Sequence, residues 1–312
     1  MTVRRVRYSI VAPVFNEAET LPRLYERVSK AMSKLREPWE LILVDDGSTD
    51  GSTDAILALA KKDRHVRPVI FARNFGHQIA ITAGWDYALG DAVVIIDADL
   101  QDPPEAIADL IEKWKAGYEV VYAIRAEREG ESWFKRLSAS VFYRVIYRIT
   151  DVRIPVDTGD FRLMDRKVVD VLKSMRERHR FPRGMSAWVG FRQIGVHYNR
   201  SPRYAGVTKY PFRKMFLLAL NAITSFSYFP LQVATYFGFF SAGLAILAIP
   251  LVVYLRVAGI PQFTGQATTL IAVLFLGGIQ LISLGVLGEY IGRLYDEAKG
   301  RPLYIVRAAP GD

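Results

Sequence analysis

The chain of 312 residues is long enough for one large domain and a smaller second part. Its formal net charge of +9 indicates an anionic partner, such as nucleic acid, an anionic membrane surface or a phosphorylated substrate. The absence of cysteine excludes disulfide bonds and thiolate metal sites.

Up to about residue 210, short β-branched runs alternate with amphipathic stretches, which is typical of an α/β domain with a mostly parallel sheet. The predicted strands are Tyr8–Pro13, Trp39–Asp45, Val66–Ala72, Ala92–Asp97 and Glu119–Ile124. The predicted helices are Glu19–Leu35, Ser52–Lys62, His77–Leu89 and Pro104–Ala116. The apolar run near the N-terminus continues into acidic sequence without a cleavage-site pattern. We therefore interpret it as a first strand, not a signal peptide, and expect a cytosolic domain.

The first two predicted strands end in acidic loops, "VAPVFNEAE" and "LILVDDGSTDGS". Ligands of open α/β sheets bind at the carboxyl ends of strands, where Glu17 and Asp46 can accept hydrogen bonds from a base or a ribose. Two alternatives stay open: Glu17 as a charge that complements a helix dipole, and the second loop as a structural turn with Ser48 or Ser52 as N-cap. A calcium loop is excluded, because its twelfth position is Leu57.

A later strand ends in "VVIIDADLQDPPE", which carries four carboxylates. Asp97 and Asp99 are hard oxygen ligands suited to Mg²⁺ or Mn²⁺, and Gln101 can join them. The remaining ligands would be water and the phosphates of a substrate. The alternative is a solvated acidic turn. We interpret Asp102 and Glu105 as helix-start residues, where acids favour the dipole.

Two stretches near the C-terminus, Leu231–Leu255 and Val257–Gly288, contain no charged residue. Their best windows, Val233–Val253 and Leu270–Gly288, are long enough to span a bilayer, which takes roughly 20 residues. The alternative is a pair of buried helices in a soluble core. The connection carries only Arg256, whereas basic residues flank the other ends at Arg213, Lys214, Arg293, Lys299 and Arg301. By the positive-inside rule, both ends are cytoplasmic and the loop faces outward.

Two basic, aromatic-rich amphipathic stretches, residues 132–149 and 212–229, are predicted to lie in the headgroup layer, with an ordinary surface helix as the alternative. We therefore expect a catalytic α/β domain over residues 1–210 and a juxtamembrane amphipathic helix over 211–230. A two-helix transmembrane hairpin over 231–292 and a cytoplasmic tail over 293–312 follow.

The motifs "PVFNEAE", "VDDGSTDGS", "RNFGHQIAITAG" and "DADLQDPPE", in this order, resemble the GT-A glycosyltransferases that use nucleotide sugars. The later "DTGDFRLMDRKV", "RSPRYAGVTKYPFRK" and "LGEYIGRLYDEAKGRPLYIV" are similar to the bacterial polyisoprenyl-phosphate glycosyltransferases, relatives of dolichol-phosphate mannose synthase. The resemblance covers nearly the whole chain, including the membrane tail.

The resemblance implies a role for each matching residue. The nucleotide pocket would be lined by Pro13, Phe15, Glu17, Asp46, Asp97 and Ala98. The metal, Mg²⁺ or Mn²⁺, would be held by Asp97, Asp99 and Gln101. Asp157 and Asp99 are the implied catalytic residues. Asp157 would act as a base, orient the acceptor, bind a sugar hydroxyl or shape its loop. Phosphates would be bound by Arg200, Arg203 and Lys209, with Arg125 and Arg136 as further candidates that are otherwise surface charges.

The implied activity is an inverting, metal-dependent transfer of a hexose from a nucleotide sugar to a polyprenyl phosphate at the cytoplasmic face of the inner membrane. UDP-glucose is the expected donor, with GDP-mannose or another UDP-sugar as alternatives. A processive polysaccharide synthase is disfavoured, because "ERHRFPRGMSAWVG" lacks the Q-x-x-R-W motif. The intact acids argue against a non-catalytic membrane scaffold, and the spans argue against nucleic acid as the partner. Oligomeric state stays open.

Overall fold

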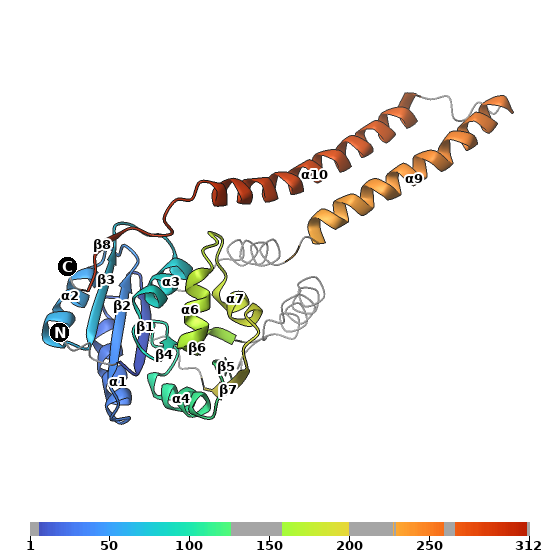
Figure 1. Ribbon diagram of the computed structural model, residues 1–312. Coiled ribbons are helices and arrows are strands. Elements are labelled where there is room, and N and C mark those ends of the chain that lie inside the picture. The colour runs from blue at the N-terminus through green and yellow to red at the C-terminus, as the bar shows by residue number, and fades with distance from the viewer. Residues whose placement is uncertain (1–5, 126–157, 200–226, 228, 259–265, 311–312) are drawn as a thin grey trace. The chain divides into compact units, whose positions relative to one another are not determined.

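The computed structural model describes residues 6–125, 158–199, 227, 229–258 and 266–310 (Figure 1). The chain forms two compact units. Unit 1 comprises Met1–Ala222 together with Arg301–Asp312, and unit 2 comprises Ile223–Gly300.

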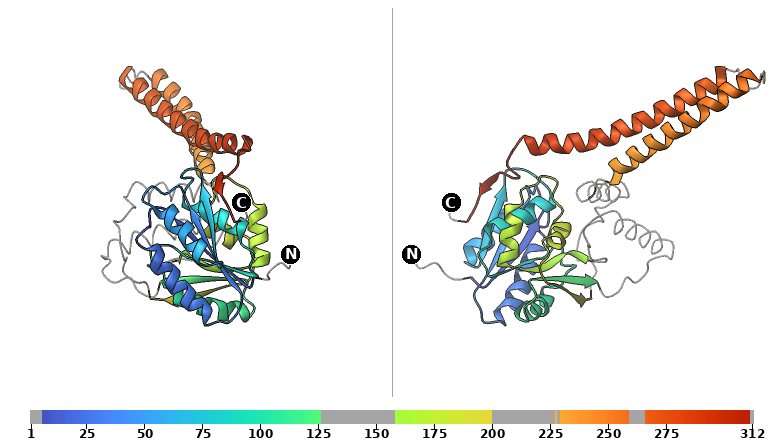
Figure 2. Two further views of the ribbon diagram at one scale, coloured as in Figure 1. Left: turned by 90° about the vertical axis from the view of Figure 1, so that its left-hand side faces the viewer. Right: turned by 45° about the vertical axis from the view of Figure 1, so that its right-hand side comes forward.

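Unit 1 is built on a mixed sheet with the strand order β7-β5-β6-β4-β1-β2-β3-β8 (Figures 1 and 2). The strands are β1 Tyr8–Val14, β2 Trp39–Asp45, β3 Val66–Phe71, β4 Ala92–Ile95, β5 Val120–Arg125, β6 Thr158–Asp165, β7 Gln193–Tyr198 and β8 Val306–Ala308. Neighbouring strands in the run β4-β1-β2-β3 are parallel, and so are β5 and β7. Strands β6 and β8 pair antiparallel with their neighbours. The predicted α/β fold with a mostly parallel sheet is confirmed.

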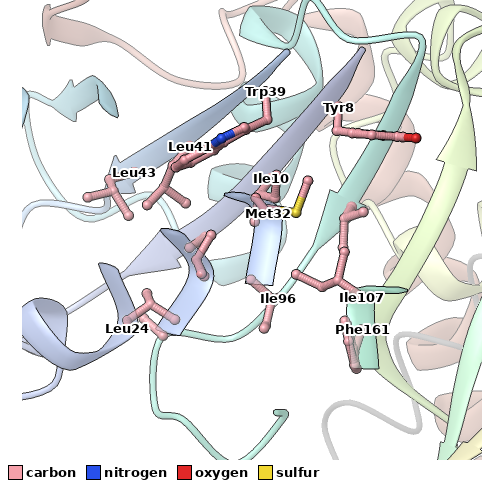
Figure 3. Close-up of a cluster of buried hydrophobic side chains, with 14 of the residues drawn as sticks. Tyr8, Ile10, Leu24, Met32, Trp39, Leu41, Leu43, Ile96, Ile107 and Phe161 are labelled. Atoms are coloured by element: carbon pink, nitrogen blue, oxygen red, sulfur yellow. The ribbon is translucent and has the colours of Figure 1, made fainter. Parts of the chain in front are cut away.

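Helices cover both faces of this sheet. They are α1 Leu21–Ser33, α2 Ser52–Lys62, α3 His77–Tyr87, the 3₁₀ turn η1 Pro104–Ala106, α4 Ile107–Lys115, α6 Arg166–Ser174 and α7 Pro182–Trp188. Side chains alternate along β1, so Tyr8 and Ile10 join the core formed with α1, α2 and α4 (Figure 3). Val11 points to the opposite face and packs against Gly84 of α3.

Strand β4 is shorter than predicted. It ends at Ile95, which is the last residue paired with both neighbouring strands, and not at Asp97. The Ile96 amide still donates to the Val11 carbonyl at 3.0 Å. The chain then turns away through Leu100, whose φ of 61° is incompatible with a strand. The predicted helix at Pro104–Ala116 is divided into η1 and α4.

Unit 2 contains two long apolar helices, α9 Phe229–Val257 and α10 Gln266–Ala298, which lie side by side (Figures 1 and 2). Both are long and apolar enough to cross a membrane, over Phe229–Ala248 and Ala272–Ala298, and neither window is buried. The two predicted spans lie within α9 and α10. The stretch 132–149 and nearly all of 212–229 fall outside the described residues.

After α10 the chain returns to unit 1. Strand β8 pairs antiparallel with β3 at the edge of the sheet. Tyr304 stacks on Phe71, with ring centroids 5.1 Å apart, and its hydroxyl donates to Asp86 at 2.8 Å. Part of the segment predicted as a separate C-terminal tail is therefore a strand of the α/β domain.

Candidate active site

The loops that follow β1 and β2 are joined by hydrogen bonds. The backbone amide of Asn16 donates to Ser48 Oγ at 3.0 Å, and the backbone amide of Glu17 donates to Ser52 Oγ at 2.9 Å. Pro13 is buried within β1, whereas the Phe15 side chain is 40% exposed. These hydroxyls therefore organise the first loop, and neither acts as the N-cap of α2, which is Gly51.

Asp46 is buried and holds the loop that follows β3. Its carboxylate accepts hydrogen bonds from the Phe75 amide at 2.6 Å and the Gly76 amide at 3.0 Å. Burial raises the pKa of Asp46, although these two hydrogen bonds oppose the shift. Gly47, with φ 70°, lets the two loops meet, because a Cβ there would lie 2.5 Å from the Arg73 carbonyl carbon. The role predicted for Asp46 in nucleotide binding stays a prediction.

The turn after β4 presents the acids predicted to bind metal. Ala98 and Leu100 are buried, while Asp97, Asp99 and Gln101 are half-buried. The backbone amide of Gln101 donates to Asp99 Oδ1 at 3.1 Å, and this hydrogen bond stabilises the turn. Positive φ is unfavourable for a leucine, so this conformation persists only where the surroundings hold it.

The residues of this turn fit a hard divalent cation. Asp97 Oδ1 is buried and accepts no hydrogen bond from any described residue. Burial raises the pKa of Asp97 to about 6; the His77 charge lowers it, and the nearby Asp102, Asp160 and Asp99 charges raise it. A cation would relieve this clustering of negative charge. Among the described residues, no group of three acids or histidines is arranged to hold a metal. Further ligands would therefore come from water or a substrate, as Mg²⁺ usually requires.

His77 opens α3 and lies between two carboxylates. Its Nε2 atom is 3.5 Å from Asp97 Oδ1 and 3.4 Å from Asp160 Oδ2. Burial lowers the pKa of His77, but the hydrogen bond with Asp160 and the Asp97 charge outweigh burial and raise it to about 9. The imidazole links the β4 turn to β6.

Asp160 is also bound by Arg183 of α7. Arg183 Nε and Nη2 donate to the two Asp160 oxygens at 2.8 and 3.1 Å, a bidentate pair. Burial opposes ionisation, but the charge of Arg183 and the hydrogen bond with His77 hold the pKa of Asp160 well below its usual range. Buried Arg162 donates to the Gly159 carbonyl and to Ser186, and burial lowers its pKa to about 10.

Asp102 differs from its predicted role as a dipole-complementing helix-start residue. It is buried, and its Oδ1 accepts a hydrogen bond from the hydroxyl of Tyr198 at the end of β7. Glu105 does lie in the first turn of η1, where it is bound by Arg27. Arg125 ends β5 opposite Tyr198 in the strand register.

Five of the predicted residues lie outside the described part of the chain. They are the proposed catalytic Asp157 and the phosphate-binding candidates Arg136, Arg200, Arg203 and Lys209. The structure brings together Asp97, Asp99, Gln101 and Ala98 on one turn. Because β1 and β2 are parallel neighbours, the loops after them, which carry Phe15, Glu17 and Asp46, lie at the same edge of the sheet.

Sequence reasoning missed His77 and Asp160. His77 belongs to "RNFGHQ", which follows β3 and so forms another loop at the carboxyl edge of the parallel strands. Asp160 stands in "DTGDF", three residues after the predicted acid. The position of His77 after a strand was the available signal. Nothing in the local sequence pairs either residue with Asp97.

The α/β sheet, with acidic loops at the carboxyl ends of its parallel strands, has the arrangement of a GT-A domain, in which ligands bind at those strand ends. Two apolar helices long enough to cross a membrane are joined to it. The chain belongs to glycosyl transferase family 2, whose profile matches residues 9–172. The profile of the GtrB C-terminal hairpin matches residues 229–294. The protein is therefore a glycosyltransferase.

Its relatives match over nearly their full length. It is 51% identical to the uncharacterized glycosyltransferase YkcC of Bacillus subtilis, over 99% of this chain and 95% of that protein. It is 45% identical to the bactoprenol glucosyl transferase of Shigella phage SfII, over 97% of this chain and 98% of that protein. Among solved structures, the mannosyltransferase PcManGT of Pyrobaculum calidifontis, in complex with GDP-Man and Mn²⁺, is 17% identical with a TM-score of 0.45. It covers 93% of this chain and 88% of that one.

Proposed function

We propose that this glycosyltransferase moves glucose from UDP-glucose onto a polyprenyl phosphate at the cytoplasmic face of the inner membrane. The observation that carries the proposal is the acidic turn after β4, with Asp97 and Asp99, in a domain that is joined at both ends to an apolar helical hairpin. The names of the relatives, bactoprenol glucosyl transferases, support glucose as the sugar and a polyprenyl lipid as the acceptor.

The hairpin explains how a folded domain reaches a lipid substrate. A polyprenyl chain stays in the bilayer while its phosphate lies at headgroup level, so the enzyme must be held against that surface. The hairpin leaves unit 1 after residue 222 and rejoins it at residue 301. Both ends are therefore expected on one side, and the basic residues near them favour the cytoplasm.

On the donor side, Asp97, Asp99 and Gln101 would hold Mg²⁺ or Mn²⁺, which when bound neutralises charge on the departing nucleoside diphosphate. His77 lies between Asp97 and Asp160, with its Nε2 atom within 3.5 Å of an oxygen of each. We assign the nucleotide pocket to Pro13, Phe15, Glu17, Asp46, Asp97 and Ala98.

On the acceptor side, the nucleophile is a phosphate oxygen. A phosphate monoester has a second pKa of about 6 and is largely ionised at neutral pH, so a strong general base is unnecessary. We propose that Asp157 orients the acceptor and that one direct displacement inverts the anomeric centre. The phosphates would be bound by Arg125, Arg136, Arg200, Arg203 and Lys209.

The test is to incubate membranes containing the protein with radiolabelled UDP-glucose, GDP-mannose and other UDP-sugars in parallel. We expect label from UDP-glucose to enter an organic-extractable lipid. Asp97→Asn and Asp99→Asn should abolish this transfer while leaving the protein folded in detergent. Asp91→Asn is the matched control, because Asp91 precedes the opposite end of β4 and pairs with Arg7.

If label enters the lipid only from GDP-mannose, the transferred sugar is mannose and not glucose. Label in a growing polymer would indicate a processive synthase, and no transfer from any donor would indicate a scaffold. Full turnover by both aspartate variants would overturn the metal assignment.

A further inference from the structure

The turn after β4 is held from a distant strand. The Tyr198 hydroxyl donates to Asp102 Oδ1, a contact between residues 96 positions apart in sequence. Tyr198 is 6% exposed and Asp102 is 1% exposed, so water does not compete for this hydrogen bond. Asp102 follows Gln101 directly and closes the turn that begins at Asp97.

This turn needs external support because its backbone is strained. Leu100, at its centre, has φ 61° and is 2% exposed. Its first end is fixed by the sheet, where the Ile96 amide donates to Val11. Its second end is fixed by Tyr198. A strained leucine held between two anchors sets the direction in which Asp99 and Gln101 point.

Tyr198 is itself rigidly placed. Its ring packs edge-on against Phe161 of β6, with centroids 5.6 Å apart. Its backbone is paired with Arg125 across the β5–β7 register. Burial and the negative charge of Asp102 raise the pKa of Tyr198, so the phenol stays protonated and donates at neutral pH. In sequence, the basic segment that begins at Arg200 follows two residues later.

We propose that Tyr198 is a positioning residue: through its hydrogen bond to Asp102 it fixes the turn that presents Asp99 and Gln101 to the cation and the donor diphosphate. This inference rests on the proposed function for the identity of the donor. Tyr198 acts through Asp102, as outer residues orient the ligands of metal sites in general.

The decisive variant is Tyr198→Phe, which removes one oxygen atom and keeps the ring against Phe161. On the full chain in detergent, we expect Mn²⁺ binding in the presence of UDP, measured by electron paramagnetic resonance, to weaken about tenfold. The KM for UDP-glucose should rise by a similar factor. Asp102→Ala should have the same effect. Asp102→Asn retains a carbonyl acceptor and should recover most of the loss.

The matched control is Tyr25→Phe. Tyr25 donates to Asp63 at 2.8 Å, a bond of the same chemistry between α1 and the turn before β3. It should leave Mn²⁺ binding unchanged. If Tyr198→Phe does not fold, the pair Asp102→Ala and Asp102→Asn carries the same test.

The proposal is overturned if Tyr198→Phe and Asp102→Ala bind Mn²⁺ within twofold of the parent protein, or if Tyr25→Phe weakens binding equally. It is also overturned if Asp102→Asn loses as much as Asp102→Ala, because charge and not the hydrogen bond would then matter. Because Mn²⁺ binding is read without turnover, a parent protein that transfers no sugar would refute the proposed function and leave this test intact.

Discussion

At the scale of single residues, Asp160 joins the charges at the carboxyl edge of the sheet. Its oxygens meet Arg183 in a bidentate pair and His77 at 3.4 Å, and its side chain is 4% exposed. Without this carboxylate, Arg183 and His77 would lose the negative charge that they share. Such a change costs more than the ion pair itself contributes, because the remaining charges stay partly desolvated.

We therefore predict that Asp160→Asn lowers the free energy of unfolding by roughly 2 kcal/mol at pH 7. Arg183 is 30% exposed, and water limits the loss. The pKa of Asp160 is held well below 3.8, its unfolded value. Its stabilisation is therefore present above about pH 4 and is lost as pH falls through the folded pKa. Urea denaturation in detergent at pH 7 and pH 3 should show the difference shrinking at the lower pH.

The control for this prediction is Asp170→Asn. Asp170 pairs with Arg166 at 3.4 Å, and its side chain is 58% exposed. Such exposed pairs contribute less than about 1 kcal/mol. Equal stability of the two variants at pH 7 would contradict the prediction that the buried Asp160 carboxylate stabilises the fold more than an exposed one does.

Which site residues were predictable depends on where their partners lie. Asp97 and Asp99 directly follow an aliphatic run, and that position alone marks the end of a buried strand. Buried Asp102 is bound by the hydroxyl of Tyr198, which lies 96 residues away in sequence. A contact with such a separation leaves no local pattern, so an acid before two prolines was interpreted as a helix start.

At the scale of elements, the close approach of α3 to β1 sets the position of His77. A Cβ at Gly84 would lie 2.0 Å from Val11 Cγ1, so the helix can pack this near only with glycine. In an exposed helix, replacing glycine by alanine stabilises by up to about 1 kcal/mol. At Gly84 the clash with Val11 makes the same replacement destabilising.

We predict that Gly84→Ala destabilises the protein by about 2 kcal/mol, because it overpacks the interface between α3 and β1. Val11→Ala removes the clashing methyl groups. The double variant Val11→Ala/Gly84→Ala should therefore lose at least about 1 kcal/mol less unfolding free energy than the two single variants lose in sum. Urea denaturation of the parent protein, both single variants and the double variant measures this difference. Strict additivity would show that the helix does not contact Val11.

Two of the strands that were not predicted, β6 and β8, depend on partners distant in sequence. The central strands were predicted because they are buried on both faces and read as aliphatic runs. Strand β6, "TGDFRLMD", contains buried Asp160 and Arg162, which tertiary partners compensate. Strand β8 has three residues and exists through its pairing with β3. Neither carries the periodicity of an isolated strand.

At the scale of the whole molecule, the C-terminal strand bears on the membrane topology that we propose. Residues 301–312 belong to unit 1, where Tyr304 packs on Phe71 and donates to Asp86. A chain whose segments before and after the hairpin fold into one domain must cross the bilayer an even number of times. The proposed hairpin of two spanning helices meets this requirement, and the charge distribution predicts the same topology.

The last prediction tests this topology by cysteine labelling, for which the chain offers no background because it contains no cysteine. Ala258 follows α9 and Lys299 follows α10, and both are exposed. In intact spheroplasts, we expect a membrane-impermeant maleimide to label Ala258→Cys and not Lys299→Cys, because the proposed topology places the connection between the helices outside. After permeabilisation, both variants should be labelled. Labelling of Lys299→Cys from outside would contradict a cytoplasmic catalytic domain. Protection of both sites in spheroplasts would contradict a hairpin that spans the membrane.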